Sequence, residues 1–288
     1  MTYLTTFRRS HMQGIHFGLT NRVPLAVLGV MLGAALISGC HEEGAYHAPC
    51  AQAVAPVGLY SVTGDGQVAV YWIAVEPENV SQFVVYRSTS PDGGFHEIGH
   101  TNGDYFVDNA VANGVTYYYA VTAIDFCGYE TQLSRETAYD TPRPEGFDAR
   151  IYDANGDNWP RSGWDLSLAR SVPWDDVDAD MYFIRTDGGD FLVAANTETD
   201  IQDAGYAGFD DVSWAPTSGW SPTGSAEVIP GHVYVVWTKS NNFAKVRARS
   251  MSLDYLTFDW AYQVAEGNPE LAPRPVRESA PLNLKPGG

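Results

Sequence analysis

Short runs of alternating apolar and polar residues, separated by turn residues, fill the segment 56–141. In the run QVAVYWIAV, the residues Val68, Val70 and Trp72 occupy alternate positions. A period of two is typical of a β-strand with one buried face. The runs are separated by Gly-Asp-Gly at 64–66, Pro-Asp-Gly-Gly at 91–94 and Asn-Gly at 113–114, which are turn sequences. Seven strands in about 85 residues predict an all-β sandwich.

Several residues of this segment resemble the fibronectin type III family. The similarity lies in Trp72, in VVYRS at 84–88 and in NGVTYYYAVTAIDFCGYETQLS at 113–134. Val111 and Tyr117 fall where the family has its corner leucine and tyrosine. The resemblance implies a Greek-key sandwich over residues 56–141, and a seven-stranded sandwich of another family is the alternative.

His96, Glu97 and His100 match the H-E-x-x-H pattern, in which two histidines hold zinc and the glutamate acts as a base. Both imidazoles reach one metal only on a helix, because residues four apart in a strand are separated by about 13 Å. In the sandwich layout FHEIGH is a short strand between Gly93-Gly94 and Asn102-Gly103, which leaves too few residues for a stable helix. We therefore predict an edge strand and no zinc site at residues 96–100.

No nucleophile motif, phosphate-binding loop or dinucleotide fingerprint occurs in the sequence. We therefore predict that the protein is not an enzyme. A glycan-processing activity, with carboxylates brought together by the fold, is the alternative.

The N-terminal sequence has the features of a secretory leader. Arg8, Arg9 and Arg22 precede the apolar run VPLAVLGVMLGAALISGC, which is short for a membrane span. Its end, LISGC, resembles the bacterial lipobox, and this implies cleavage after residue 39 and attachment of lipid, including palmitate, at Cys40. After cleavage, residues 40–55 would form a tether. An uncleaved anchor helix is the alternative.

The residue after the cysteine and the net charge bear on location and partners. In lipoproteins of this kind an aspartate after the cysteine favours the inner membrane, and here His41 follows, so we expect the outer membrane or cell surface. The chain has 17 Lys and Arg against 35 Asp and Glu, a net charge of −18. This charge disfavours nucleic acid as a partner and leaves neutral glycans, proteins and cations.

With Cys40 assigned to lipid, Cys50 and Cys127 remain in an oxidising compartment. Cys50 precedes the first predicted strand and Cys127 follows the sixth. Antiparallel strands place these two positions at the same end of a sandwich, so we predict a Cys50–Cys127 disulfide. Two unrelated thiols are the alternative.

Residues 146–267, after the short junction TPRPEG, are predicted to form a second antiparallel β domain. Seven of the eight tryptophans lie between Trp159 and Trp260, and HVYVVWT, FAKVRARSM and YLTFDWAYQV read as a meander. In its middle strand Lys245, Arg247 and Arg249 share one face, which we expect to be solvated, with anion binding as the alternative. Residues 268–288 are rich in proline and are predicted to form an extended tail.

SGWDLSL at 162–168, with PGHVYVVWTKSNNFAKVRARS and LTFDWAYQ further on, loosely resembles HmuY-like lipoprotein domains, an all-β group that includes haem binders. Haem ligation in that group relies on pairs of histidines. This domain has one, His232, and the departure argues against haem.

Asp153, Asn155 and Asp157 stand at alternate positions, the spacing with which calcium loops begin. The sixth and twelfth positions of such a loop want glycine and glutamate, and here they are Asn158 and Trp164. A looser calcium cage and a plain turn with side-chain hydrogen bonds both remain open. Calcium is therefore the one cofactor that the sequence leaves open, and no other cofactor is expected.

Trp214 and Trp220, in SWAPTSGWSP, could form a platform for sugar rings, or could simply cover the core of a small β domain. Together these features predict a lipid-anchored binding or adhesion protein of the bacterial cell envelope, without catalytic activity, whose ligand is a glycan or a protein. The alternatives are a structural envelope scaffold, a glycan-processing enzyme, and a haem-binding or calcium-binding lipoprotein.

Overall fold

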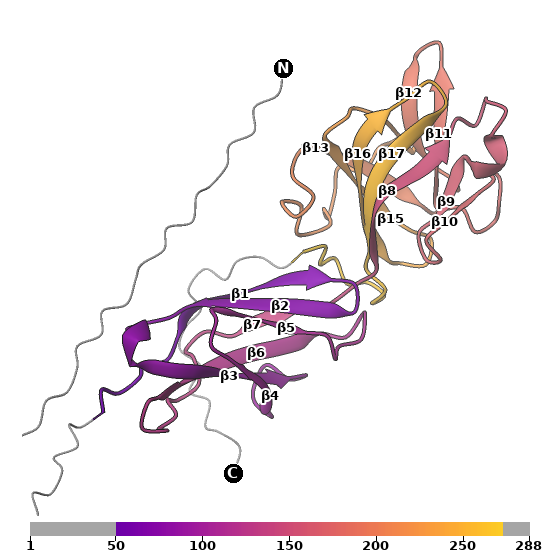
Figure 1. Cartoon of the computed structure of the whole chain (residues 1–288). Coiled ribbons are helices and arrows are strands. Elements are labelled where there is room, and N and C mark those ends of the chain that lie inside the picture. The colour runs from indigo at the N-terminus through magenta and orange to yellow at the C-terminus, as the bar shows by residue number, and fades with distance from the viewer. Residues whose placement is uncertain (1–49, 273–288) are drawn as a thin grey trace, which may run out of the picture. The chain divides into compact units, whose positions relative to one another are not determined.

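The computed structural model describes residues 50–272, and the regular secondary structure in this range is almost entirely antiparallel β-sheet. Strands between Val57 and Asp140 pair among themselves, and strands between Glu145 and Tyr262 do the same (Figure 1). The predicted all-β class is confirmed. The predicted leader with Cys40 lies outside the described residues.

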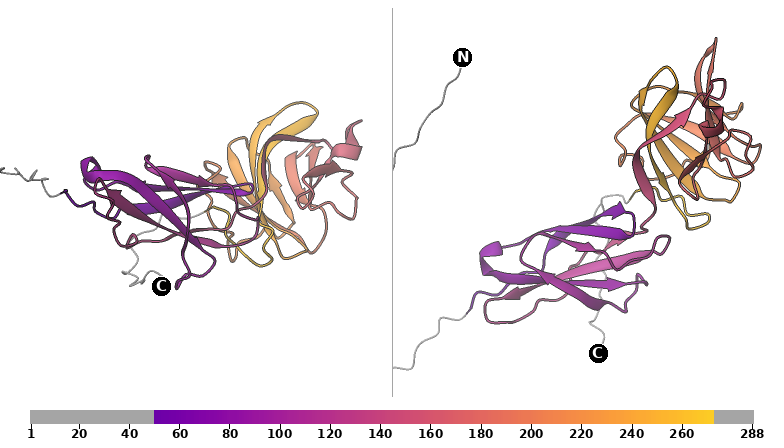
Figure 2. Two further views of the ribbon diagram at one scale, coloured as in Figure 1. Left: turned by 60° about the horizontal axis from the view of Figure 1, so that its bottom comes forward. Right: turned by 45° about the vertical axis from the view of Figure 1, so that its right-hand side comes forward.

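Residues 57–140 form a sandwich of two sheets, which are stacked as two layers in Figure 2. One sheet has the strand order β1-β2-β5 and the other the order β4-β3-β6-β7. The elements are β1 (Val57–Gly64), β2 (Gln67–Ile73), a short 3-10 helix η1 (Pro77–Asn79), β3 (Val80–Ser88), β4 (His96–Thr101), β5 (Tyr105–Asp108), β6 (Tyr117–Asp125) and β7 (Ala138–Asp140).

The core of this sandwich follows the predicted alternation. Val68, Val70 and Trp72 are buried, and the Trp72 ring meets the edge of Phe83 on the facing sheet with ring centroids 5.4 Å apart. The hydroxyl of Tyr117 accepts a hydrogen bond from the backbone N–H of Ala112 at 3.0 Å, which is the corner contact that the resemblance implied. Alternating apolar residues therefore fix which face of each strand is buried.

The segment TQLSRETAY at 131–139, which the sandwich layout would make the seventh strand, forms a strand only at β7. The segment before it is irregular: Ser134 N–H donates to the carbonyl of Val121, whereas the Glu136 carboxylate accepts from Leu59 N–H at 3.2 Å. Since Val121 and Leu59 belong to different sheets, this segment crosses between them and cannot continue one ladder.

Residues 145–262 form two further five-stranded sheets, ordered β10-β9-β11-β12-β14 and β13-β15-β16-β17-β8. The elements are β8 (Glu145–Tyr152), a short 3-10 helix η2 (Trp159–Arg161), β9 (Gly163–Asp165), β10 (Arg170–Val172), β11 (Met181–Thr186), β12 (Gly189–Ala194), β13 (Asp200–Tyr206), β14 (Ser225–Glu227), β15 (His232–Trp237), β16 (Phe243–Met251) and β17 (Tyr255–Tyr262). The predicted meander is β15, β16 and β17.

The main core of this part lies between its two sheets. The face of β17 that carries Leu256, Phe258 and Trp260 at alternate positions is buried there. Trp164 of β9 meets Phe258 edge to face, with ring centroids 5.1 Å apart and 88° between the planes.

The expectation of a solvated basic row on β16 is wrong for Lys245, which is 0% exposed. Its Nζ donates to the carbonyl of Phe209 at 2.6 Å and lies 4.3 Å from the centroid of that ring. The loop before β14 covers this face of the sheet, so the side chain of Lys245 is enclosed by apolar and peptide groups. Arg249 is exposed and stands 3.6 Å from the carboxylate of Asp259.

The folded part extends beyond the predicted boundary at residue 267. Glu270 pairs with Trp214 in an isolated β-bridge, and Leu271 N–H donates to the carbonyl of Ser213 at 2.8 Å. The Leu271 side chain packs against Val235 in a small apolar cluster, and this burial holds the segment in place. Over residues 50–272, no helix has the length and apolar character needed to cross a membrane.

Candidate functional site

The H-E-x-x-H residues lie on β4, which is an edge strand as predicted. His100 Nε2 contacts the Glu97 carboxylate at 2.9 Å, and His96 is exposed. Among residues 50–272, no group of three or more His, Cys, Asp or Glu side chains could hold a metal ion. The strand conformation separates the two histidines along the chain. That the protein has no catalytic activity stays a prediction.

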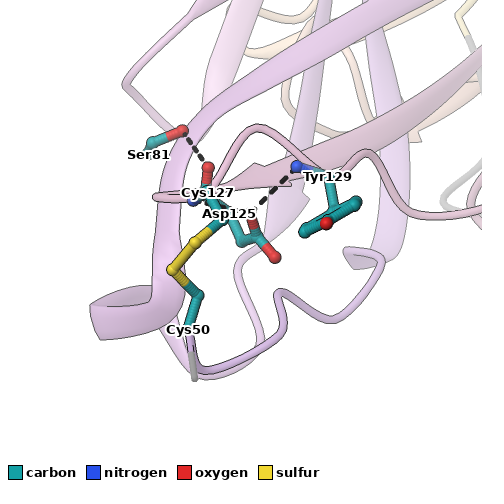
Figure 3. The surroundings of a disulfide bond; sticks show 5 residues. All are labelled: Cys50, Ser81, Asp125, Cys127 and Tyr129. Atoms are coloured by element: carbon teal, nitrogen blue, oxygen red, sulfur yellow. Dashed lines mark hydrogen bonds between the residues drawn. A yellow bond between two sulfur atoms is a disulfide. The ribbon is translucent and has the colours of Figure 1, made fainter. Parts of the chain in front are cut away.

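Cys50 and Cys127 form the predicted disulfide, with their Cα atoms 6.0 Å apart (Figure 3). Beside it the Asp125 carboxylate accepts hydrogen bonds from the N–H groups of Cys127 and Tyr129, at 2.8 and 3.0 Å. Ser81 Oγ donates to the carbonyl of Asp125 at 3.0 Å. The turn after β6 is therefore held from both sides, which places Cys127 next to the incoming chain at Cys50.

The calcium candidates lie in the turn after β8. Asp153 Oδ1 accepts from the N–H groups of Asn155 and Arg185, at 3.1 and 2.9 Å. The Asn155 amide donates to the carbonyl of Arg185 at 2.8 Å, and Asp157 is exposed. These contacts are those of a turn stabilised by side-chain hydrogen bonds. A calcium ion would have to share the Asp153 carboxylate with them.

Trp214 and Trp220 come from the same loop, between β13 and β14. Trp214 lies where the loop pairs with Glu270. Trp220 instead packs on the apolar cluster around Val235 and contacts Trp237, which sequence reasoning did not single out.

Trp237 ends β15 and is 36% exposed. Its ring stacks on Phe243, directly opposite on β16, with centroids 5.4 Å apart and 23° between the planes. The Trp237 Nε1–H donates to Asn241 Oδ1 at 3.0 Å, which fixes the indole. The Trp220 ring approaches it with centroids 5.8 Å apart and a 41° tilt. We call these four residues the Trp220–Trp237 surface.

Polar groups border this surface. Ser221 follows Trp220, and its hydroxyl lies 3.1 Å from that of Thr223. Gly219 adopts a positive φ of 90°, and a Cβ there would stand 3.1 Å from the amide nitrogen of Gln202, so the glycine lets the loop lie against that side chain. Partly exposed rings beside hydroxyl and amide groups suit the apolar C–H faces and the hydroxyls of a sugar.

A second exposed aromatic group lies on the sheet β1-β2-β5. Tyr71 stacks between Tyr60 and Tyr105, with centroid distances of 5.0 and 5.7 Å and interplanar angles of 10° and 25°. Because the neighbours cover both faces of the Tyr71 ring, this row presents mainly ring edges. Ring edges suit apolar protein side chains better than sugar faces, so the Trp220–Trp237 surface is the better glycan candidate.

One of the two ring nitrogens of His232 is engaged by a carboxylate. Its Nδ1 contacts the Asp203 carboxylate at 2.9 Å on the neighbouring strand β13. It is the one histidine between residues 146 and 267.

Comparison with known proteins gives partial matches. No protein-family model matches the chain. An amylopullulanase of Thermoanaerobacter thermohydrosulfuricus is 31% identical over 129 residues, which are 44% of this chain and 8% of that protein. An amylopullulanase of Thermoanaerobacterium saccharolyticum is 31% identical over 94 residues, 32% of this chain and 7% of that one. The chain thus spans less than a tenth of these relatives.

Among solved structures, a Fn3-like protein from Clostridium thermocellum is 26% identical and covers 33% of this chain and 100% of its own, with a TM-score of 0.28. The structure named FN3tt is 18% identical, covers 31% of this chain and 91% of its own, and has a TM-score of 0.25. These neighbours are fibronectin type III-like domains.

Proposed function

We propose that the protein is a noncatalytic, glycan-binding component of the bacterial cell envelope, attached by lipid at Cys40. The Trp220–Trp237 surface carries the glycan proposal. It offers more than a third of the Trp237 side chain to solvent, next to hydroxyl and amide groups. The similarity to amylopullulanases, whose name refers to amylose-type glucans and pullulan, supports a neutral glucan as the ligand class.

The charge of the chain supports the same ligand class. A net charge of −18 disfavours polyanions at the surface, whereas a neutral polysaccharide meets no such repulsion. The lipid anchor rests on the LISGC sequence before residue 41.

Pullulan binding to the purified protein tests this proposal. We expect saturable binding that weakens at least tenfold in Trp237→Ala, because the variant loses the exposed ring. Trp174→Ala is the matched control, since Trp174 is also a partly exposed tryptophan, 41% exposed, in another part of the chain. No binding to pullulan or to other neutral glucans, or equal loss in both variants, would overturn the assignment.

A structural envelope scaffold is the second candidate, and the row Tyr60–Tyr71–Tyr105 favours it. Ile73, on the same strand as Tyr71 and two residues further on, is 62% exposed, so the sheet presents an apolar face. Co-purification of an envelope protein that is lost in Tyr71→Ser, with pullulan binding unchanged, would support this role.

A further inference from the structure

Three of the four arginines in the acidic segment 145–211 line a single hollow. This segment holds 16 Asp and Glu. The hollow has a volume of about 540 Å³, and Arg150, Arg161 and Arg170 form its basic lining. Its volume is in the range of small-ligand sites. Arginines that are merely solvated need not gather at one place. Their convergence within a strongly acidic segment therefore points to a binding role.

Two of these arginines are held by aromatic rings. The Arg150 guanidinium carbon lies 4.9 Å from the Tyr255 ring centroid, and that of Arg161 lies 4.6 Å from the Tyr152 centroid. The two tyrosines are paired across β8 and β17, with centroids 5.6 Å apart. A guanidinium stacked on a ring keeps its in-plane N–H groups free to donate.

The positive charge of the hollow is neutralised locally at Arg170 but not at the other two arginines. Arg170 pairs with Asp165 at 3.0 Å and with Asp178 at 3.1 Å. Over the described residues 50–272, in contrast, neither Arg150 nor Arg161 forms an ion pair with a carboxylate.

The remaining lining adds one acid and one hydroxyl. Asp148 is the only carboxylate among the described lining residues, Ser171 contributes a hydroxyl, and Trp164 contributes part of its buried ring. Because Asp165 and Asp178 offset the charge of Arg170, Arg150 and Arg161 face one lining carboxylate, and the hollow keeps an excess of positive charge.

We propose that this hollow binds the carboxylate of an acidic saccharide, a sugar of the uronate class. A planar carboxylate matches the forked donors of Arg150 and Arg161. The surrounding acidic surface repels polyanions of high charge density, so the ligand that fits carries no more than one carboxylate on each hydroxylated sugar unit. Ser171 supplies a hydroxyl that can bond to a sugar hydroxyl. The Tyr152 hydroxyl accepts a hydrogen bond from Arg161 Nη1 at 3.3 Å, which helps to orient that guanidinium.

The site is separate in its residues from the Trp220–Trp237 surface, so the two proposals fail independently. Trigalacturonate and maltotriose are the two probes, each titrated into the purified full-length protein by calorimetry. We expect saturable binding of trigalacturonate that weakens at least tenfold in Arg161→Gln and in Arg150→Gln. Arg135→Gln removes the same charge at an exposed position outside this segment and should bind as the parent protein does.

Further measurements in the same experiment identify the ligand class. Trp237→Ala should leave trigalacturonate binding unchanged, and excess maltotriose should not compete. A Gly-Glu-Gly peptide that binds as tightly as trigalacturonate would overturn the saccharide assignment. Binding that is absent, or equal in Arg161→Gln and Arg135→Gln when both variants melt as the parent does, would overturn the site itself.

Discussion

Lys245 Nζ donates to the backbone carbonyl of Phe209 and lies over the face of the same residue's ring, at 2.6 Å from the oxygen and 4.3 Å from the ring centroid. The side chain of Lys245 is fully buried, while its nearest acid, Asp210 at 3.5 Å, is largely exposed. Burial, followed by the charge of Arg143, lowers the pKa of Lys245 to about 7. Because the pKa of Lys245 differs between the folded and unfolded states, this lysine makes the free energy of unfolding depend on pH.

Replacing Lys245 by methionine should change how stability depends on pH above neutrality. The folded pKa lies below the unfolded value of 10.5, so the unfolded state binds more protons between pH 7 and pH 10. Stability of the parent should therefore rise across this window, by up to about 1.4 kcal/mol per pH unit from this group. Lys245→Met should lack that rise and be relatively more stable at pH 6.

Urea unfolding at pH 6, 8 and 9.5 measures the effect. Lys239→Met, at an exposed lysine, is the control and should follow the parent. Parallel pH profiles for the parent and Lys245→Met would contradict the buried, proton-linked role.

Asp180 should link stability to pH in the opposite sense. Burial, aided by nearby Asp165, raises the pKa of Asp180 to about 6, although its carboxylate accepts from Leu166 N–H at 2.9 Å. The protonated form of Asp180 is favoured in the folded state. Its contribution to stability is fully present below the unfolded pKa and is lost as the pH rises through the folded pKa of about 6. Asp180→Asn keeps an acceptor without the charge, so it should gain about 2 kcal/mol over the parent between pH 4 and pH 7.

Chemical unfolding of Asp180→Asn at these two pH values provides the test. Asp187→Asn, in an exposed hairpin turn, should show no such gain. A variant that is equally destabilised at both pH values would show that the carboxylate has a packing role only.

The Cys50–Cys127 disulfide should stabilise the first sandwich. It closes a loop with a sequence separation of 77, for which chain entropy predicts about 4 kcal/mol. Cys50→Ser with Cys127→Ser should lower the free energy of unfolding by this order. Dithiothreitol should shift the parent toward the double variant and leave the variant unchanged, and a parent insensitive to reduction under unfolding conditions would contradict the bond.

Calcium at the turn of Asp153, Asn155 and Asp157 stays a prediction that melting experiments decide. If the turn holds an ion, millimolar calcium should raise the melting temperature, and Asp157→Ala should abolish the rise by removing a ligand. Magnesium at the same concentration is the control ion. A flat response to calcium would mean that the hydrogen bonds of Asp153 serve the turn alone.

Lipid attachment at Cys40 can be tested in a bacterial host that processes lipoproteins. The parent should label with palmitate and sediment with membranes, because acyl chains contribute about 0.8 kcal/mol per buried methylene. Cys40→Ser should lose the label and accumulate as unprocessed precursor. Label retained in that variant would place the lipid elsewhere.

Local sequence was a good guide to the strands. The alternation that buries Val68, Val70 and Trp72, and that of Leu256 and Phe258, needs only the two-residue period of a strand with one covered face. The disulfide followed from counting antiparallel strands. The strand at His96 followed from the glycine turns around it.

Side-chain environments were harder to predict, and Lys245 shows why. Its alternation with Ala244 and Val246 placed it correctly on the outer face of β16, but the loop that carries Phe209 covers that face. Leu271 was likewise assigned to a tail, yet it fills the small cluster beside Val235. Burial at such positions depends on segments far away in the chain.

The sequence by itself determined the all-β class, the strands of the first sandwich and of the final meander, the disulfide partners and the acidic character of the chain, because these depend on local periodicity, strand parity and composition. Only the tertiary structure decided that Trp220 meets Trp237, and that Arg150, Arg161 and Arg170 converge on one hollow. The physical reason is that binding surfaces are assembled from loops and strand ends whose approach is set by sheet packing, and no pattern within a single segment encodes that approach.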